Sequence, residues 1–452
     1  MENALKAAAG EALAWFRRSS PGMSVEVYLY KGRTRSIEMR DGRPDMLQEC
    51  SEEGLGLRVM ADGRMGFSYA GSLEPDAWPV LHRAALEQFA HVPPDPHRCL
   101  PRPEPAMAQE ELAATLNDEG FFQEPLTEWA SRLERVQDFA LAADPRVRKV
   151  ISAGYGESLG EASIASTEGI WTFETGTSCS VGLTVMAEQG GEVQVGSGYC
   201  VARRSEGLDL ERVARGGVER AARLLGSRRL HSGRRAVIFD PWVAGEFLEV
   251  LAVSMSAEVV QRGKSLLRGR LGQRIASEKV TFFDDPRRPG GLASAFYDDE
   301  GVPTRRKTMV EGGVLRDIFY DATTARRDDR ASNGCAGRPS YRVLPGCTSS
   351  NFYLAPGGMT RDALIADTRD GLLVLEVMGM HTADPVSGDL SVGVSGVSIQ
   401  DGRLGHGVCG AMLSGDLLGL LERVDAVADD LTFYGGFAAP TFRVADVMIG
   451  GS

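Results

Sequence analysis

Residues 54–69 read GLGLRVMADGRMGFSY, and this stretch decides the class of fold. Two apolar-rich runs, 54–60 and 65–69, flank the sequence Ala61-Asp62-Gly63-Arg64. An Asp-Gly pair between two such runs is typical of a β-hairpin, because both residues tolerate the positive φ angles of its tight turn. The stretch therefore predicts two antiparallel strands joined at 61–64.

The residues on either side extend this hairpin into a meander with covering helices. Strand-like runs at 24–30 and 36–40 precede it, and further strands follow a helical segment. Strands joined by tight turns favour an α+β fold over a doubly wound parallel sheet. The predicted helices are 2–18, 75–91, 124–143 and 208–225, and the predicted later strands are 148–152, 161–166, 170–175 and 179–188.

A polar and basic stretch at 226–235, GSRRLHSGRR, predicts a domain boundary. We expect an N-terminal α+β domain with an antiparallel sheet at 1–230 and a β-rich C-terminal domain at 231–452. Many short strands between Gly-rich turns predict a curved-sheet or barrel-like C-terminal body. Its predicted elements are a helix at 242–260 and strands at 278–283, 314–320, 352–355, 372–378, 391–399, 407–414 and 441–448.

Composition narrows the class of partners. The 452 residues carry a formal net charge of -12, which disfavours binding to nucleic acid phosphates. The seven cysteines are widely spaced and form no CxxC pair, so we expect reduced thiols. The first residues lack the pattern of a signal peptide, and no stretch approaches about 18 consecutive apolar residues. These features predict a cytoplasmic protein that does not cross a membrane.

Histidine spacing limits the catalytic chemistry. No HExxH motif occurs, and no two of the six histidines lie within five residues of each other. A zinc site built from two histidines on one helix is therefore excluded. No phosphate-binding loop of the GxxxxGK[ST] type occurs either. A GxSxG nucleophile elbow needs its serine on a sharp turn between a strand and a helix, whereas Gly393-Val394-Ser395-Gly396 falls inside a predicted strand and is one residue short.

His381 is the one histidine in a suggestive setting, the stretch MGMHTADPVSGDLSVGVSG. Asp384, Ser387, Gly388 and Asp389 follow it closely. One interpretation is an Asx-turn cluster that closes a hairpin, with Asp and Ser oxygens accepting from backbone amides. The other is a loop that contacts a ligand, and the sequence leaves both open.

Several blocks in a shared order resemble the TldD/PmbA (TldE) family, often labelled "modulator of DNA gyrase". The resemblance covers nearly the whole chain. In the first half it rests on residues 53–59, EGLGLRV, followed by Gly63 and Gly66. In the second half it rests on residues 269–276, 280–281, 284–286, 299–304, 311–315, 351–353, 384–391 and 439–444.

The resemblance also implies what this chain lacks. The active TldD-type subunit carries an HExxxH motif on a helix before the Gly-x-x-Gly-Gln block, and this places the motif at 248–253. Leu248 and Val253 stand at the two histidine positions, and Glu249 stands at the glutamate position. The family's cysteine ligand near the C-terminus is absent too, because residues 410–452 contain no Cys.

The resemblance therefore implies a TldE/PmbA-type subunit without a catalytic residue or metal of its own, with zinc in a TldD-like partner. The pair would form a cytoplasmic peptidase that degrades or trims unfolded or leader peptides. His381, Asp384, Ser387, Gly388 and Asp389 are the candidate peptide-binding residues. No nucleic acid partner is implied.

Two alternatives stay open. The chain could be an autonomous hydrolase with a relocated metal site, drawn from His381, His406, Cys409 or nearby carboxylates. It could instead be a self-associating, peptide-binding scaffold without a peptidase role. A homodimer that forms when the partner is absent is compatible with both the subunit interpretation and the scaffold interpretation.

Overall fold

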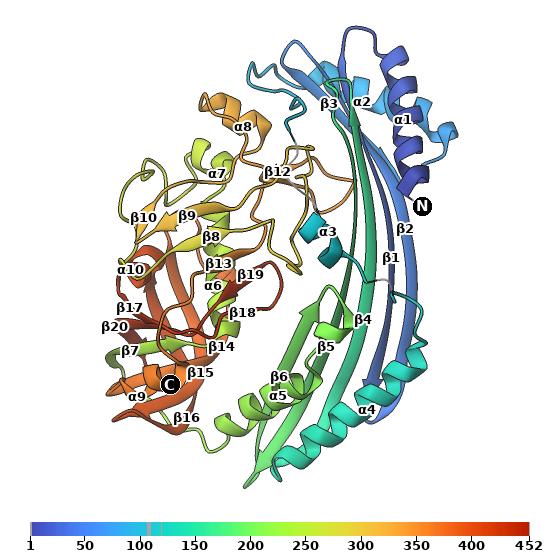
Figure 1. The fold of residues 1–452 in the computed structure, drawn as a ribbon. Helices are drawn as coiled ribbons and strands as arrows, with labels where there is room; N and C mark the ends of the chain where they lie inside the picture. Colours follow the sequence, from blue (N-terminus) through green and yellow to red (C-terminus); the bar gives the residue numbers. More distant parts are fainter. Residues whose placement is uncertain (1, 106–109, 119, 452) are drawn as a thin grey trace.

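Two bodies make up the chain in a computed structural model that describes residues 2–105, 110–118 and 120–451. Figure 1 shows a long curved sheet on one side and a smaller strand-rich body on the other. The first sheet is antiparallel throughout, in the order β3-β2-β1-β4-β5-β6. Its strands are β1 (Ser24–Arg40), β2 (Arg43–Ala61), β3 (Arg64–Ala70), β4 (Val147–Ser166), β5 (Trp171–Gln189) and β6 (Glu192–Ala202).

The predicted hairpin is confirmed. Met60 pairs with Met65 and Ala61 with Arg64, so Asp62 and Gly63 form the turn. Both turn residues have positive φ, 48° and 71°. These are the angles that a tight hairpin turn requires and that an Asp-Gly pair tolerates.

Several predicted short strands are parts of longer ones. The runs 24–30 and 36–40 belong to the single strand β1, and β4 and β5 likewise each join two predicted strands. The polar stretch 31–35 of β1 interrupts the apolar alternation, but its backbone stays paired, with Lys31 opposite both Glu53 and Glu161. Alternation of apolar residues indicates that one face of a strand is buried. At residues 31–35 no other described element buries that face, but the hydrogen-bonded pairing of the strand continues.

Helices cover one face of the first sheet. Val25, Val27 and Met39 of β1 belong to the apolar cores under the helices, whereas Glu26 points to the opposite face and reaches the C-terminal body. Alternate residues of a strand point to opposite faces, so one strand supplies both surfaces. The helices are α1 (Glu2–Ser19), α2 (Trp78–His91), α4 (Leu126–Ala143) and α5 (Leu210–Leu224), with the shorter α3 (Glu110–Leu116).

Strand β6 was not predicted, because its sequence is rich in glycine. Gly196 and Gly198 lie directly against α5, and a Cβ at either position would collide with the backbone of that helix. Glycine in a strand often marks such a close approach of another backbone.

A closed five-stranded barrel forms the centre of the C-terminal body, as the barrel-like prediction expected. Four of its pairings follow the order β16-β15-β14-β7-β20, and β16 pairs with β20 to close the ring. Strand β17 (Val424–Val427) adds to β20. The barrel strands are β7 (Gly233–Phe239), β14 (Asp370–Met378), β15 (Asp389–Gln400), β16 (Arg403–Asp416) and β20 (Phe442–Gly450).

A second small sheet, of order β10-β9-β8-β13-β19-β18, packs with helix α6 (Pro241–Ser254) on the same apolar core as the barrel. Its strands are β8 (Phe282–Asp284), β9 (Lys307–Glu311), β10 (Val314–Leu315), β13 (Phe352–Leu354), β18 (Thr432–Phe433) and β19 (Phe437–Ala439). The remaining elements are α7 (Ala257–Gln261), α8 (Ala322–Arg327), α9 (Arg361–Ala366), α10 (Leu417–Glu422) and the pair β11 (Ala336–Gly337) and β12 (Gly346–Cys347).

The single helix predicted at 242–260 is wrong, because α6 ends at Ser254 and α7 begins at Ala257. The backbone between them pairs with Phe319: the Phe319 amide donates to Met255 O at 2.9 Å, and the Ala257 amide donates to Phe319 O at 2.9 Å. A long-range contact therefore replaces the helical hydrogen bonds. The strand predicted at 314–320 is likewise short, and covers only Val314–Leu315.

The α+β class is confirmed, whereas the domain boundary between residues 230 and 231 stays a prediction. No helix within the described ranges is long and apolar enough to span a bilayer.

Candidate functional site

Helix α6 carries the three motif positions inferred from the resemblance. Leu248 is only 2% exposed and belongs to the core, whereas Val253 is 48% exposed. Five residues of a regular helix turn through about 500°, so these two side chains point about 140° apart. Leucine and valine side chains carry no donor atom, so these two inferred motif positions offer no metal ligand.

The exposed face of α6 is a narrow stripe. Trp242, Glu246, Glu249 and Val253 follow each other at intervals of three or four residues, which places them on one side of the helix. Burial raises the pKa of Glu246, and the charge of nearby Glu249 adds to this effect. We call these four residues the α6 stripe.

The loop around His381 has the geometry of an Asx turn. The Asp384 carboxylate accepts from the Val386 amide at 2.8 Å and from the Ser387 hydroxyl at 3.1 Å. The bond from the Val386 amide, with the Ser387 bonds, lowers the pKa of Asp384. The Gly388 amide donates to Asp384 O at 2.8 Å, and the φ of Gly388 is 82°. These side chains thus serve the turn itself.

Both ends of this loop are exposed. Asp389 begins β15 and its amide donates to the Ser387 hydroxyl at 3.1 Å. His381 lies on the short 3-10 helix η3 (Met380–Thr382) and is exposed. An exposed imidazole beside a rigid turn can contact a ligand, although the turn needs no ligand to be stable.

Tertiary structure brings this loop against the end of α6. The hydroxyl of Ser254 donates to Pro385 O at 3.0 Å, and the amide of Leu266 donates to the same oxygen at 3.3 Å. The sequence interval between Ser254 and Pro385 is 131 residues. The end of α6, which carries the inferred motif positions, and the loop that follows His381 therefore lie side by side. The sequence did not predict this contact.

The residues of a relocated metal site are engaged separately. His406 Nδ1 lies 3.3 Å from the Ser398 hydroxyl, and Cys409 Sγ lies 3.2 Å from the Ser227 hydroxyl. Within residues 2–105, 110–118 and 120–451, no group of three or more His, Cys, Asp or Glu residues is placed to hold a metal ion.

A buried charge network joins two of the sequence blocks. Arg58 of β2 donates through Nε to Glu26 at 2.8 Å and through Nη1 to Glu300 at 2.9 Å, and its Nη2 also contacts Glu26. Arg338 donates to the same Glu26 at 3.0 Å. All four side chains are at most 4% exposed. The network ties the first sheet to the C-terminal body, and sequence reasoning missed it because its members are up to 312 residues apart.

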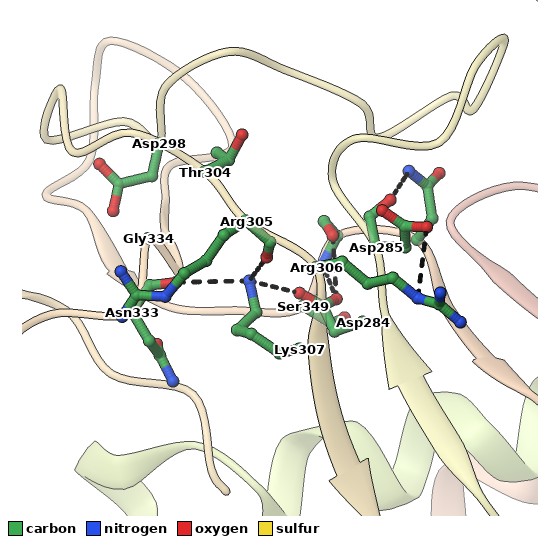
Figure 2. A network of polar contacts seen from close by, with 12 residues as sticks. Asp284, Asp285, Asp298, Thr304, Arg305, Arg306, Lys307, Asn333, Gly334 and Ser349 are labelled. Atoms are coloured by element: carbon green, nitrogen blue, oxygen red, sulfur yellow. Dashed lines mark hydrogen bonds and ion pairs between the residues drawn. The ribbon is translucent and has the colours of Figure 1, made fainter. Parts of the chain in front are cut away.

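A second buried pair, shown in Figure 2, anchors the loops of the C-terminal body. Lys307 Nζ lies 2.9 Å from Asp284 Oδ2 and donates to Arg305 O at 3.0 Å. Burial opposes the charge, but Cys335 and Asp284 beside it raise the pKa of Lys307 to about 12. The other oxygen of Asp284 accepts from the amide and the hydroxyl of Ser350, at 2.6 and 2.9 Å.

These anchored loops and β5 line an open cavity of about 170 Å³. Glu174 of β5 lines it, and its carboxylate accepts from the amides of Phe296 and Tyr297 at 2.6 and 2.7 Å. Burial raises the pKa of Glu174 to about 8, although these amides favour the charged form. Burial likewise raises the pKa of Asp298 to about 8.

Comparison with known proteins defines the class. Three domain models of PmbA/TldA metallopeptidases match this chain. They are the PmbA/TldA metallopeptidase domain 1 at 25–89, the central domain at 120–225 and the C-terminal domain at 232–451. The chain belongs to the PmbA/TldD family.

Individual relatives agree with this assignment. A "Metalloprotease" of Methanothermobacter thermautotrophicus is 28% identical over 440 residues, which cover 93% of this chain and 94% of that protein. "Metalloprotease PmbA" of Escherichia coli O157:H7 is 25% identical over 435 residues, with 94% and 92% covered.

Solved structures agree as well. A protein described as a modulator of a DNA gyrase from Thermotoga maritima superposes with a TM-score of 0.89 at 25% identity, covering 98% of this chain and all of that one. TldE from Thermococcus kodakarensis has the same fold, with a TM-score of 0.88 at 21% identity over 98% of this chain and 100% of that one.

Proposed function

We propose that this chain is a non-catalytic, TldE/PmbA-like subunit of a cytoplasmic two-subunit metallopeptidase that degrades or trims unfolded or leader peptides. The observation that carries the proposal is on α6, where Leu248 lies in the core and Val253 is exposed at the two inferred histidine positions. Glu249 remains, but a general base has no activated water to use without a metal. Zinc would belong to a TldD-like partner.

The role of this subunit would be to complete the peptide-binding cavity. Residues 43–54 of β2 pair with β1 on one side only, because β3 joins β2 from Leu55 onward. Such a free edge can accept an extended peptide as an added strand, which reads backbone rather than side chains. Broad substrate range follows from this mode of binding.

The loop at 381–389 is the second proposed contact with peptide. Asp384, Ser387, Gly388 and Asp389 lie on the Asx turn and His381 lies on η3 beside it, and the Ser254 bond to Pro385 joins this loop to the end of α6. A peptide that passes the α6 stripe would meet the exposed imidazole of His381 next.

Reconstitution tests the proposal. The purified chain is expected to contain essentially no zinc by mass spectrometry and to leave unfolded peptides uncut. Mixing it with a TldD-like subunit should give a stable complex that cleaves them. A Glu249→Gln variant should keep the wild-type kcat in that complex, because Glu249 activates no water, whereas a change in KM would report contact of this side chain with the peptide.

Two outcomes would select the alternatives. Close to one zinc per chain with cleavage by the chain alone would establish an autonomous hydrolase. Failure to form any complex with a TldD-like subunit, together with self-association and peptide binding, would establish a scaffold. A homodimer that gives way to the heterodimer on mixing fits the proposal.

A further inference from the structure

A separate cleft lies between helix α5 and the barrel. It has a volume of about 350 Å³ and opens beside the carboxyl end of β7. Arg212 and Arg220 of α5 line one wall, Arg361 and Tyr434 line the other, and Asp240 lies at the floor. Figure 1 shows α5 beside the lower barrel strands, and this is the region where the first sheet meets the barrel.

Two guanidinium groups share one carboxylate at the floor of the cleft. Asp240 lies 3.2 Å from Arg220 Nη2 and 3.1 Å from Arg361 Nη2, and it also accepts from the Trp242 amide at 3.1 Å. Asp240 is only 5% exposed. In the described part of the chain, the buried Nε of Arg220 has no hydrogen-bond partner. Burial raises the pKa of nearby Glu376, and the charge of Arg220 opposes this rise, so a second carboxylate lies close to this guanidinium group.

The other acidic residues of the cleft are occupied elsewhere. Asp209 caps α5 by accepting from the Arg212 amide at 2.9 Å. Asp430 accepts from the amide and hydroxyl of Thr441, at 2.8 and 2.7 Å. Glu219 pairs with Arg223 at 2.7 Å. Four arginines and four carboxylates line the cleft, so its formal charges balance: Arg212, Arg215, Arg220 and Arg361 against Asp209, Glu219, Asp240 and Asp430. Among the described residues, the Arg212 guanidinium contacts the Tyr434 hydroxyl and has no carboxylate within ion-pair distance.

Aromatic side chains fix the geometry of the wall. The ring of Tyr434 lies 4.9 Å from that of Trp242, and the Arg220 guanidinium lies 5.2 Å from the Trp242 ring. Arg212 reaches the Tyr434 hydroxyl at 3.5 Å. Guanidinium groups that stack on aromatic rings lose less conformational entropy when they bind a ligand. This wall is therefore preorganised for a planar anion.

We propose that this cleft binds a carboxylate group of the peptide, with Arg361 and Arg212 as its cationic partners and the Tyr434 hydroxyl as a further donor. The inference rests on the proposed peptide-handling function. A carboxylate matches the forked donors of arginine in shape and carries one charge. Asp240 would repel a second charge, so a phosphate group fits less well.

The distance from the cleft to the far end of the α6 stripe sets the length of peptide that could span them. Trp242 is both a neighbour of the cleft and the first residue of the α6 stripe, and Val253 is the last. Eleven residues of helix span about 16 Å, which equals about five residues of an extended peptide. A peptide anchored by its carboxylate in the cleft would therefore reach the degenerate motif position about five residues away.

Fluorescence anisotropy with the full-length chain alone tests the inference. The probes are three dye-labelled ten-residue peptides of Gly, Ser and Ala. The first has a free C-terminal carboxylate, the second is amidated, and the third is amidated with one internal Glu. Binding of the first with loss in the second assigns the site to the peptide C-terminus. If the internal Glu of the third probe restores binding, the site recognises a side-chain carboxylate.

Arginine variants locate the site. Arg361→Gln and Arg212→Gln should each weaken binding of the acidic probe at least tenfold, equal to about 1.4 kcal/mol. Arg361→Lys should bind with an intermediate Kd, because it keeps the charge and loses the fork. Arg18→Gln makes the same charge change on the exposed end of α1 and should leave Kd unchanged.

Two results would overturn the inference: no binding of any acidic probe by the wild-type chain, or a Kd that the amide and both glutamine variants leave unchanged. Thermal melting of each variant shows whether it is folded. Because the assay needs neither a partner nor cleavage, its failure is separate from failure of the peptidase complex to form.

Discussion

Replacing Arg58 by Met should strongly destabilise the joint between the first sheet and the C-terminal body. The change removes two bonds to Glu26 and one to Glu300. Glu26 keeps Arg338, but among the described residues Glu300 keeps only its hydrogen bond from the Ala322 amide, at 2.9 Å. A carboxylate that is 2% exposed then lacks a counter-charge.

The magnitude follows from the number and kind of bonds. Three hydrogen bonds between charged groups, at about 1.5 kcal/mol each, sum to about 4.5 kcal/mol. Breaking a buried ion pair from one side costs about 3–5 kcal/mol in other proteins, which agrees. This is a large part of the roughly 5–15 kcal/mol that stabilises a typical domain.

Urea unfolding followed by circular dichroism measures the loss in free energy of unfolding. Arg33→Met is the matched control, because Arg33 and Glu49 form an ion pair that is 52% and 59% exposed, and such pairs contribute about 0–1 kcal/mol. Adding Glu300→Leu to Arg58→Met should recover part of the loss, because no unpaired charge then remains at that position. A loss for Arg58→Met no larger than that of the control would refute the reasoning.

Three further predictions concern pH, packing and the loop. Glu174→Gln should flatten the pH dependence of stability: the folded pKa of about 8 lies above the ordinary 4.5, so the contribution of Glu174 is fully present below pH 4.5 and is lost as pH rises through about 8. Chemical unfolding at pH 4.5, 6.5 and 8.5 checks this, and an unchanged slope would contradict it. Gly198→Ala should destabilise by about 1–3 kcal/mol, because its methyl group would collide with α5. Gly245→Ala, where no atom lies within 4 Å, should be neutral or stabilising by up to about 1 kcal/mol, and equal melting temperatures for the two would argue against the close approach. Ser254→Ala should speed amide exchange at Gly388 several-fold through loss of the bond to the loop, and unchanged exchange would show that this bond does not hold the loop.

Local features of the fold were predictable from the sequence. The Asp62-Gly63 turn depends on the φ preferences of two adjacent residues, and helix α1 depends on apolar spacing within 18 residues. The inferred loss of a metal site likewise depends only on the sequence, because it rests on the apolar residues at positions 248 and 253. Each of these depends on residues close together in the chain.

Tertiary structure alone decided the rest. The helix break at Met255 depends on Phe319, the length of β1 depends on its two neighbouring strands, and the glycines of β6 depend on α5. The contact between Ser254 and Pro385 and the pairing of Arg361 with Asp240 likewise join distant segments. Such contacts depend on which surfaces pack together when the sheet and the barrel assemble. Local sequence preferences do not determine that packing.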